Sequence, residues 1–93
     1  MSTSGPPGFE VRLRSRRVQR ELRAPRGPDH QRILSALHAL AQEPRPPGCE
    51  KLEDNIYRIR VGNWRIIYHF NEARLRIEVG GVRRRSENTY RGV

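Results

Sequence analysis

Three arginines and a histidine alternate with apolar residues in the stretch IYRIRVGNWRIIYHF, residues 56–70. Successive side chains of an extended strand point to opposite faces, so Arg58 and Arg60 share one face while the apolar residues beside them share the other. Arg65 and His69 repeat the pattern in the second half of the stretch. Two neighbouring strands would then present three guanidinium groups on one rigid surface, which is suited to holding the charge of a phosphate.

A second basic segment, VRRRSENTYR at residues 82–91, follows a pair of glycines. Glycine permits unusual backbone angles, so we expect Gly80-Gly81 to let the chain turn over the end of the sheet and return toward the arginine face. A run of arginines is more often a solvated surface than a site. Its combination with the strand arginines favours one shared cationic surface, which would include Arg83, Arg84 and Arg85.

The composition favours a nucleic-acid partner. The chain has 93 residues and a formal charge of +9, so its positive field should attract nucleic acid, with an acidic protein or an anionic membrane as the alternatives. No apolar run approaches the roughly 20 residues that span a bilayer, and no signal-peptide hydrophobic region follows Met1. We therefore expect a cytoplasmic protein with no membrane association.

Metal and thiol chemistry have weak support in the sequence. His30 and His38 are eight residues apart, too far for two ligands on one helical turn, and Cys49 forms no cluster with a histidine at metal-site spacing. Rim histidines and an incidental loop thiol are the favoured interpretations. We expect no metal ion and no cofactor.

The patterning that must position the arginines predicts an α+β domain in the order β-α-α-β-β-β. Alternation with period two indicates strands, whereas apolar residues three and four apart indicate helices. The expected strands are 9–13, 56–61, 64–70 and 75–79, with a tight turn at Gly62-Asn63, and the expected helices are 16–23 and 30–42. Both helices should pack on one face of a small, mainly antiparallel sheet.

Local signals set the expected boundaries. Residues 1–8 are small, polar and broken by proline, so we expect a disordered leader before a single domain at 9–93. Ser15 is the expected N-cap of the first helix, and Asp29 is that of the second. Leu75 should face the core at the start of the last strand.

The order of these motifs resembles the RelE/ParE toxin superfamily, and in particular the RelE-like, mRNA-cleaving branch of type II toxin–antitoxin systems. The resemblance extends from about Phe9 to Arg91. LEDNIYRIRVGNWRIIYHF looks like the family's leucine, Tyr-Arg-Ile-Arg-like strand, glycine turn and Arg-Ile-Ile-Tyr-like strand. GGVRRRSENTY looks like the family ending, a basic stretch followed shortly by tyrosine.

This resemblance implies a ribosome-dependent endoribonuclease that cuts messenger RNA in the decoding site and that a tightly bound antitoxin holds inactive. In such toxins the 2′-hydroxyl attacks the adjacent phosphodiester without a metal. A toxin that is monomeric alone and hetero-oligomeric with its antitoxin is also implied. The matching site residues are Arg58, Arg60, Arg65, Arg83 and Tyr90, with Arg84, Arg85 and His69 as further RNA contacts.

The chemistry of cleavage suggests separate roles for these residues. Arg65 and Arg83 are the expected clamp for negative charge that develops on the nonbridging phosphate oxygens. Tyr90 could stack on a splayed base or take part in proton transfer, and its structural alternative is packing on the sheet edge.

The general base stays open at this point. Arg58 and Arg60 stand where some relatives carry lysine, and an arginine remains protonated, so neither is a convincing base. The remaining candidates are Tyr90, His69, Glu87 and a ribosomal group. We expect weak activity compared with the lysine-bearing relatives.

Two non-enzymatic readings are the alternatives. A ParE-like toxin would bind DNA gyrase, and a catalytically silent relative would only bind RNA, because one fold can carry several functions. The retained arginines argue against the gyrase branch, which has no need to keep them together.

Overall fold

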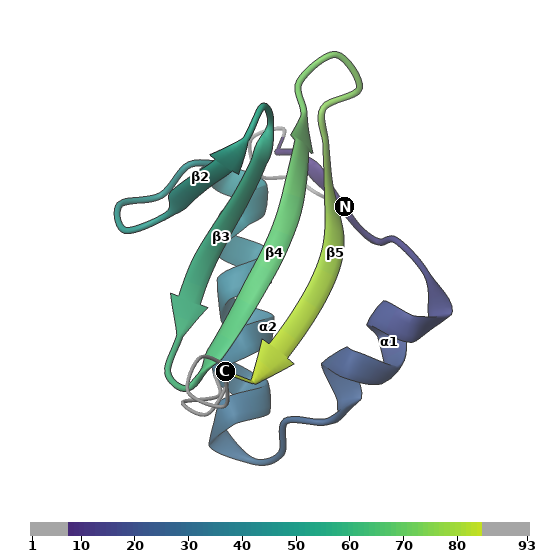
Figure 1. Ribbon diagram of the computed structural model, residues 1–93, viewed down its shortest axis with the longest axis vertical. Coiled ribbons are helices and arrows are strands. Elements are labelled where there is room, and N and C mark those ends of the chain that lie inside the picture. The colour runs from purple at the N-terminus through teal and green to yellow at the C-terminus, as the bar shows by residue number, and fades with distance from the viewer. Residues whose placement is uncertain (1–7, 85–93) are drawn as a thin grey trace, which may run out of the picture.

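A computed structural model of the chain describes residues 8–84. These residues form β1 (Glu10–Leu13), α1 (Arg16–Arg23), α2 (Pro28–Gln42), β2 (Glu50–Glu53), β3 (Ile56–Val61), β4 (Trp64–Asn71) and β5 (Arg76–Arg84). The strands make one sheet in the order β1-β5-β4-β3-β2, in which β1 runs parallel to β5 and every other neighbouring pair is antiparallel (Figure 1). The predicted α+β class is confirmed.

The two faces of the sheet differ in chemistry. One, which we call the helix face, is covered by α2, and α1 lies beside β5 (Figure 1). Apolar side chains from both helices and the three long strands form one core there: Val18, Ile33, Leu37, Leu40, Tyr57, Ile59, Trp64, Ile66, Tyr68, Phe70, Ile77, Val79 and Val82. The opposite, open face carries the polar residues that alternate with them.

Several locally signalled features are confirmed. Ser15 caps α1, because its Oγ accepts a hydrogen bond from the N–H of Val18 at 3.3 Å. Val61 pairs directly with Trp64, so Gly62 and Asn63 form the two-residue turn between β3 and β4, with Gly62 at a φ of 62°.

No helix of the described segment is long and apolar enough to cross a membrane.

One strand was missed by the sequence patterning. β2 pairs with β3 in antiparallel fashion at the edge of the sheet, and all four of its residues are exposed. An edge strand without a buried side shows no apolar alternation, so only its pairing with Ile56, Tyr57 and Arg58 reveals it.

Two expectations about single residues were wrong. α2 begins at Pro28 after Gly27, and Asp29 in its first turn is no N-cap: its carboxylate accepts a hydrogen bond from the Trp64 indole at 3.2 Å. Leu75 is 57% exposed and precedes β5, because it occupies the turn after β4 with a φ of 54°.

Candidate nucleic-acid interface

Three arginines stand side by side across the open face. Arg60 of β3 pairs with Arg65 of β4, and Arg65 pairs with Arg83 of β5. Residues directly opposite in antiparallel strands share a face, and neighbouring strands lie about 4.8 Å apart. This arginine row (Arg60, Arg65 and Arg83) therefore crosses three strands at backbone positions that span only about 10 Å.

The described part of the chain offers few acids to compensate the charge of this row. Within residues 8–84, neither Arg60 nor Arg65 lies within ion-pairing distance of a carboxylate. Arg83 has one distant partner, since its Nε lies 3.9 Å from Oε2 of Glu21 on α1. Like charges directly opposite on a sheet are unfavourable, so an anion bound over the row would relieve a repulsion that the fold tolerates.

A bulge in β5 places Arg83 in the row. Tyr68 pairs with Val79 but Ile67 pairs with Gly81, which leaves Gly80 as an extra residue. One extra residue reverses the alternation of a strand, so Val82 is buried on the helix face and Arg83 points to the open face. Without the bulge, Arg83 would share the face of Val79.

The expected turn at Gly80-Gly81 was therefore wrong, because β5 continues through both glycines to Arg84. Glu21 of α1 supports this extension: its Oε1 accepts the N–H of Val82 at 3.0 Å, beyond the end of the β1 pairing. A turn is not needed to bring Arg83 to the open face, since the bulge does so within the strand.

The other predicted arginines lie apart from the row. Arg58 is on the open face, but its guanidinium donates to the carboxylate of Glu50 on β2, directly opposite. Arg84 pairs with Trp64, which is buried on the helix face, so it belongs to the opposite side of the sheet. Arg85, Glu87 and Tyr90 lie outside the described residues.

A small hollow lies next to the row on the open face. It has a volume of about 180 Å³ and is lined by residues of β3, β4, β5 and the segment between β1 and α1, among them Arg14, Ile67, His69, Glu78, Gly80 and Arg83. His69 was a predicted site residue, whereas Arg14 and Glu78 were not. Arg14 follows the outward-facing Glu10 and Arg12 in the same alternation, so the sequence could have indicated its place on the open face. The position of Glu78 beside His69 could be predicted only from the pairing register of β4 with β5.

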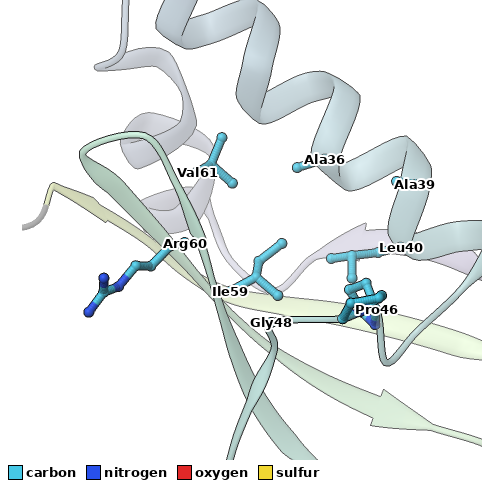
Figure 2. A pocket seen from close by; sticks show the side chains of 9 residues that line it. Ala36, Ala39, Leu40, Pro46, Gly48, Ile59, Arg60 and Val61 are labelled. Atoms are coloured by element: carbon cyan, nitrogen blue, oxygen red, sulfur yellow. The ribbon is translucent and has the colours of Figure 1, made fainter.

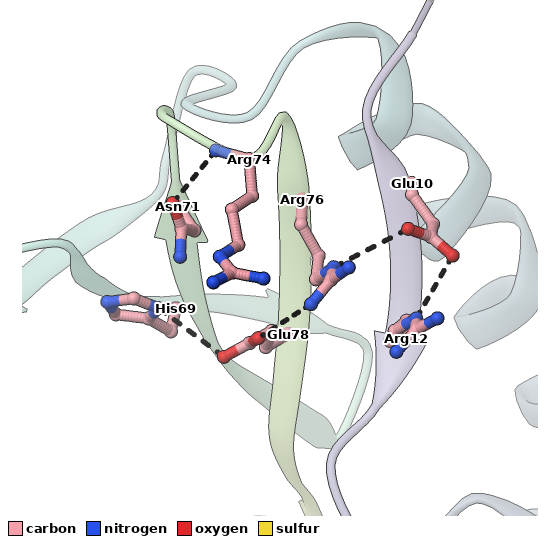
Figure 3. A network of polar contacts seen from close by, with 7 residues as sticks. All are labelled: Glu10, Arg12, His69, Asn71, Arg74, Arg76 and Glu78. Atoms are coloured by element: carbon pink, nitrogen blue, oxygen red, sulfur yellow. Dashed lines mark hydrogen bonds and ion pairs between the residues drawn. The ribbon is translucent and has the colours of Figure 1, made fainter.

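The part of the open face next to the β4–β5 loop carries a network of ion pairs (Figure 3). Glu10 lies 3.0 Å from Arg12 and 3.4 Å from Arg76, and Arg76 lies 3.7 Å from Glu78. The hydrogen bond from Arg12, with the charge of Arg76, holds the pKa of Glu10 below its usual value. His69 lies at the end of this network, with its Nδ1 3.6 Å from Oε1 of Glu78.

Charge thus divides the open face in two. The half next to the β4–β5 loop contains alternating acids and bases, whereas the half next to the β3–β4 turn contains the arginine row. His69 and Glu78 lie at the boundary, where they line the hollow. A polyanion would be attracted to the second half.

A larger hollow of about 440 Å³ has a different character. It lies between α2 and β3 and is lined by apolar groups such as Ala36, Leu40, Ile59 and Val61, and Arg60 is its one charged lining residue. Figure 2 shows the guanidinium of Arg60 pointing away from these apolar groups. This hollow lacks groups for acid–base chemistry. Residues 8–84 also contain no group of three His, Cys, Asp or Glu that could hold a metal ion.

Comparisons with known proteins agree with this architecture. The family described as "ParE toxin of type II toxin-antitoxin system, parDE" matches residues 12–89. No curated protein sequence matches the chain significantly.

Solved RelE structures share the fold. RelE in the RelE–RelB complex of Pyrococcus horikoshii OT3 is 22% identical with a TM-score of 0.74, over 86% of this chain and 98% of that chain. The isolated E. coli RelE toxin is 17% identical with a TM-score of 0.73, over 90% and 94%. The toxin–antitoxin complex RelBE2 of Mycobacterium tuberculosis gives 21% identity and a TM-score of 0.62, over 84% and 99%. With its family match across most of the chain and its RelE-like α+β fold, this chain belongs to the ParE toxin family of type II toxin–antitoxin systems, within the RelE/ParE superfamily.

Proposed function

We propose that this toxin is a ribosome-dependent endoribonuclease that cuts messenger RNA in the decoding site. The observation that supports it most strongly is the arginine row, three guanidinium groups on one open face with little compensation by acids of residues 8–84. A single-stranded message threaded over this face would place a phosphate against the row. Attraction of this kind weakens as salt rises, because bound counterions are released on association.

The proposed reaction needs charge stabilisation above all. The 2′-hydroxyl gives its proton to the general base as its oxygen bonds to the adjacent phosphorus, and the bond from phosphorus to the 5′-oxygen breaks. The 5′-oxygen takes a proton from water, so the products are a 2′,3′-cyclic phosphate and a 5′-hydroxyl. Negative charge grows on the nonbridging oxygens, and guanidinium donors fixed on strands can stabilise it without reorganising. Arg65 and Arg83 are the proposed clamp, because they are opposite each other on adjacent strands and Arg83 also lines the hollow.

The outer arginines would act on flanking phosphates. Arg60 extends the row by one strand and is unpaired within residues 8–84, so it is the stronger proposed contact. Arg58 already binds Glu50, which lowers the charge that it offers. Tyr90 and Arg85 keep their proposed roles from the family resemblance.

His69 is the proposed general base among the described residues. Its imidazole lines the same hollow as Arg83, and Oε1 of Glu78 lies 3.6 Å from its Nδ1. At this distance the contact is electrostatic and not a hydrogen bond. The carboxylate of Glu78 would stabilise the imidazolium that proton abstraction creates, and would take no proton itself.

The proposed setting is a cytoplasmic toxin controlled by an acidic antitoxin. The toxin alone would be a monomer, and the antitoxin would join it in a hetero-oligomer. An acidic segment is expected because the chain carries a formal charge of +9.

Mapping message ends in a translation extract tests the proposal. Addition of the wild-type chain should create codon-positioned 5′ ends by primer extension, and Arg65→Ala or Arg83→Ala should abolish them. Arg74→Ala is the matched control, because Arg74 is an exposed arginine of the β4–β5 loop outside the row. Arrested translation with intact messages, or cuts that persist in both row variants, would refute the nuclease. A parallel supercoiling assay with purified gyrase would then test the ParE-like alternative.

A further inference from the structure

A second arginine, Arg14, lines the hollow beside the row, and the family resemblance did not assign a role to it. Arg14 lies between β1 and α1, where its backbone N–H donates to the carbonyl of Val79 at 2.9 Å. Its neighbour Ser15 caps α1, so the backbone is held on both sides. Arg14 is therefore fixed next to the bulge of β5.

Two guanidinium groups converge on the glycines of that bulge. A Cβ built on Gly80 would lie 3.7 Å from Nη1 of Arg14, and a Cβ built on Gly81 would lie 3.4 Å from Nε of Arg83. The two glycines carry no side chain that could fill the space between the arginines. Both arginines line the 180 Å³ hollow.

The charges around this space favour an anion. Within residues 8–84, Arg14 has no carboxylate within ion-pairing distance. The one acid that lines the hollow, Glu78, lies 3.7 Å from Arg76 and 3.6 Å from His69. Two arginines therefore face a space whose lining carboxylate already lies near a third arginine, and Glu21, with Oε2 3.9 Å from Nε of Arg83, is the other acid beside the bulge.

We infer that Arg14 and Arg83 form a phosphate seat across the Gly80-Gly81 bulge, and that Arg14 contacts the RNA backbone directly. The bound strand would then cross the sheet from the arginine row toward the junction of β1 with α1. This inference rests on the proposed function for the identity of its ligand, single-stranded RNA, but it concerns binding and requires no cleavage.

A non-cleavable probe separates binding from catalysis. A 2′-O-methyl RNA trinucleotide has no free 2′-hydroxyl to attack, so it can be titrated into the purified full-length chain without a ribosome. The Nε–Hε NMR signals of Arg14 and Arg83 should both shift on saturation. Arg14→Gln should weaken binding about tenfold, the usual effect of losing a charge-assisted hydrogen bond, whereas Arg14→Lys should lose less because it keeps the charge.

Arg12→Gln is the matched control. Arg12 lies two residues before Arg14, within β1, but it pairs with Glu10 and does not line the hollow, so its replacement should leave the affinity nearly unchanged. Equal affinity of Arg14→Gln and the wild type, or a shift at Arg83 without one at Arg14, would overturn the seat and leave the nuclease proposal standing. Binding that depends on Arg14 in a chain that cuts no message would support the seat and refute only the nuclease.

Discussion

Deleting Gly80 should destabilise the toxin and remove Arg83 from the arginine row. The deletion takes away the extra residue that reverses the alternation of β5, so Val82 would turn outward and Arg83 would turn toward the core. Alternatively β5 would end before residue 82, and neither Val82 nor Arg83 would remain in the sheet. Either outcome exposes Val82, which is 2% exposed in the native fold.

The expected loss can be worked from these contacts. Exposing a buried valine costs about 2 kcal/mol. Losing the hydrogen bond between the Val82 N–H and Glu21 costs about 1 kcal/mol more. A total of about 3 kcal/mol is a large share of the roughly 5–15 kcal/mol that stabilises a small domain.

Urea unfolding followed by fluorescence measures this loss directly, because Trp64 is the only tryptophan in the chain and is buried. The matched control is Gly80→Ala, which keeps the residue count. Its new Cβ would meet Arg14 and Ile67 no closer than 3.7 Å, and Gly80 has no positive φ, so alanine should be tolerated. A deletion variant within about 0.5 kcal/mol of the wild type, which is the range of a neutral surface change, would refute the account of the bulge.

Two further changes separate contacts within the fold. Glu21→Gln keeps an oxygen that can accept the Val82 N–H but loses the charge near Arg83, so the free energy of unfolding in urea should change little. Glu21→Ala removes the acceptor and should lower that free energy by about 1 kcal/mol. Equal losses in the two variants would contradict this. Tyr68→Phe removes the donor to the Pro44 carbonyl, at 2.6 Å, and should cost about 1 kcal/mol at pH 7. Burial, with Cys49 nearby, raises the pKa of Tyr68, so its contribution is complete below the usual tyrosine pKa and is lost as pH rises above it. The gap between wild type and Tyr68→Phe should therefore narrow by pH 11, and a gap that widens would contradict the assignment.

Features with a local chemical cause could be predicted from the sequence. A side-chain oxygen at Ser15 caps a helix that starts one residue later, and Gly62 allows the positive φ of a two-residue turn. Alternation likewise placed Arg60 and Arg65 on the face opposite the core, because the period of a strand depends only on the backbone.

Features set by distant partners could not be predicted in this way. Asp29 accepts a hydrogen bond from Trp64, 35 residues away, and nothing in its own neighbourhood indicates that partner. Glu50 compensates Arg58 only because an exposed edge strand pairs with β3. The difference between Arg58 and Arg60, two arginines with the same local pattern, is therefore a product of the sheet's strand order.

The position of Arg83 combines both kinds of cause. Strand alternation from Ile77 and Val79, extended without interruption, assigns Arg83 to the helix face and Val82 to the open face. The observed burial is the reverse. This arrangement is favourable because burying the apolar valine side chain releases free energy, whereas burying the charged arginine would cost free energy. Glycine inside a strand often marks a bulge, so Gly80-Gly81 followed by Val-Arg-Arg is consistent with one. The bulge can be predicted only if the apolar residues before and after the glycines are required to lie on the same, buried face. The same bulge then clears the space that Arg14 and Arg83 face, so one extra residue accounts for the continuity of the core, the arginine row and the hollow beside it.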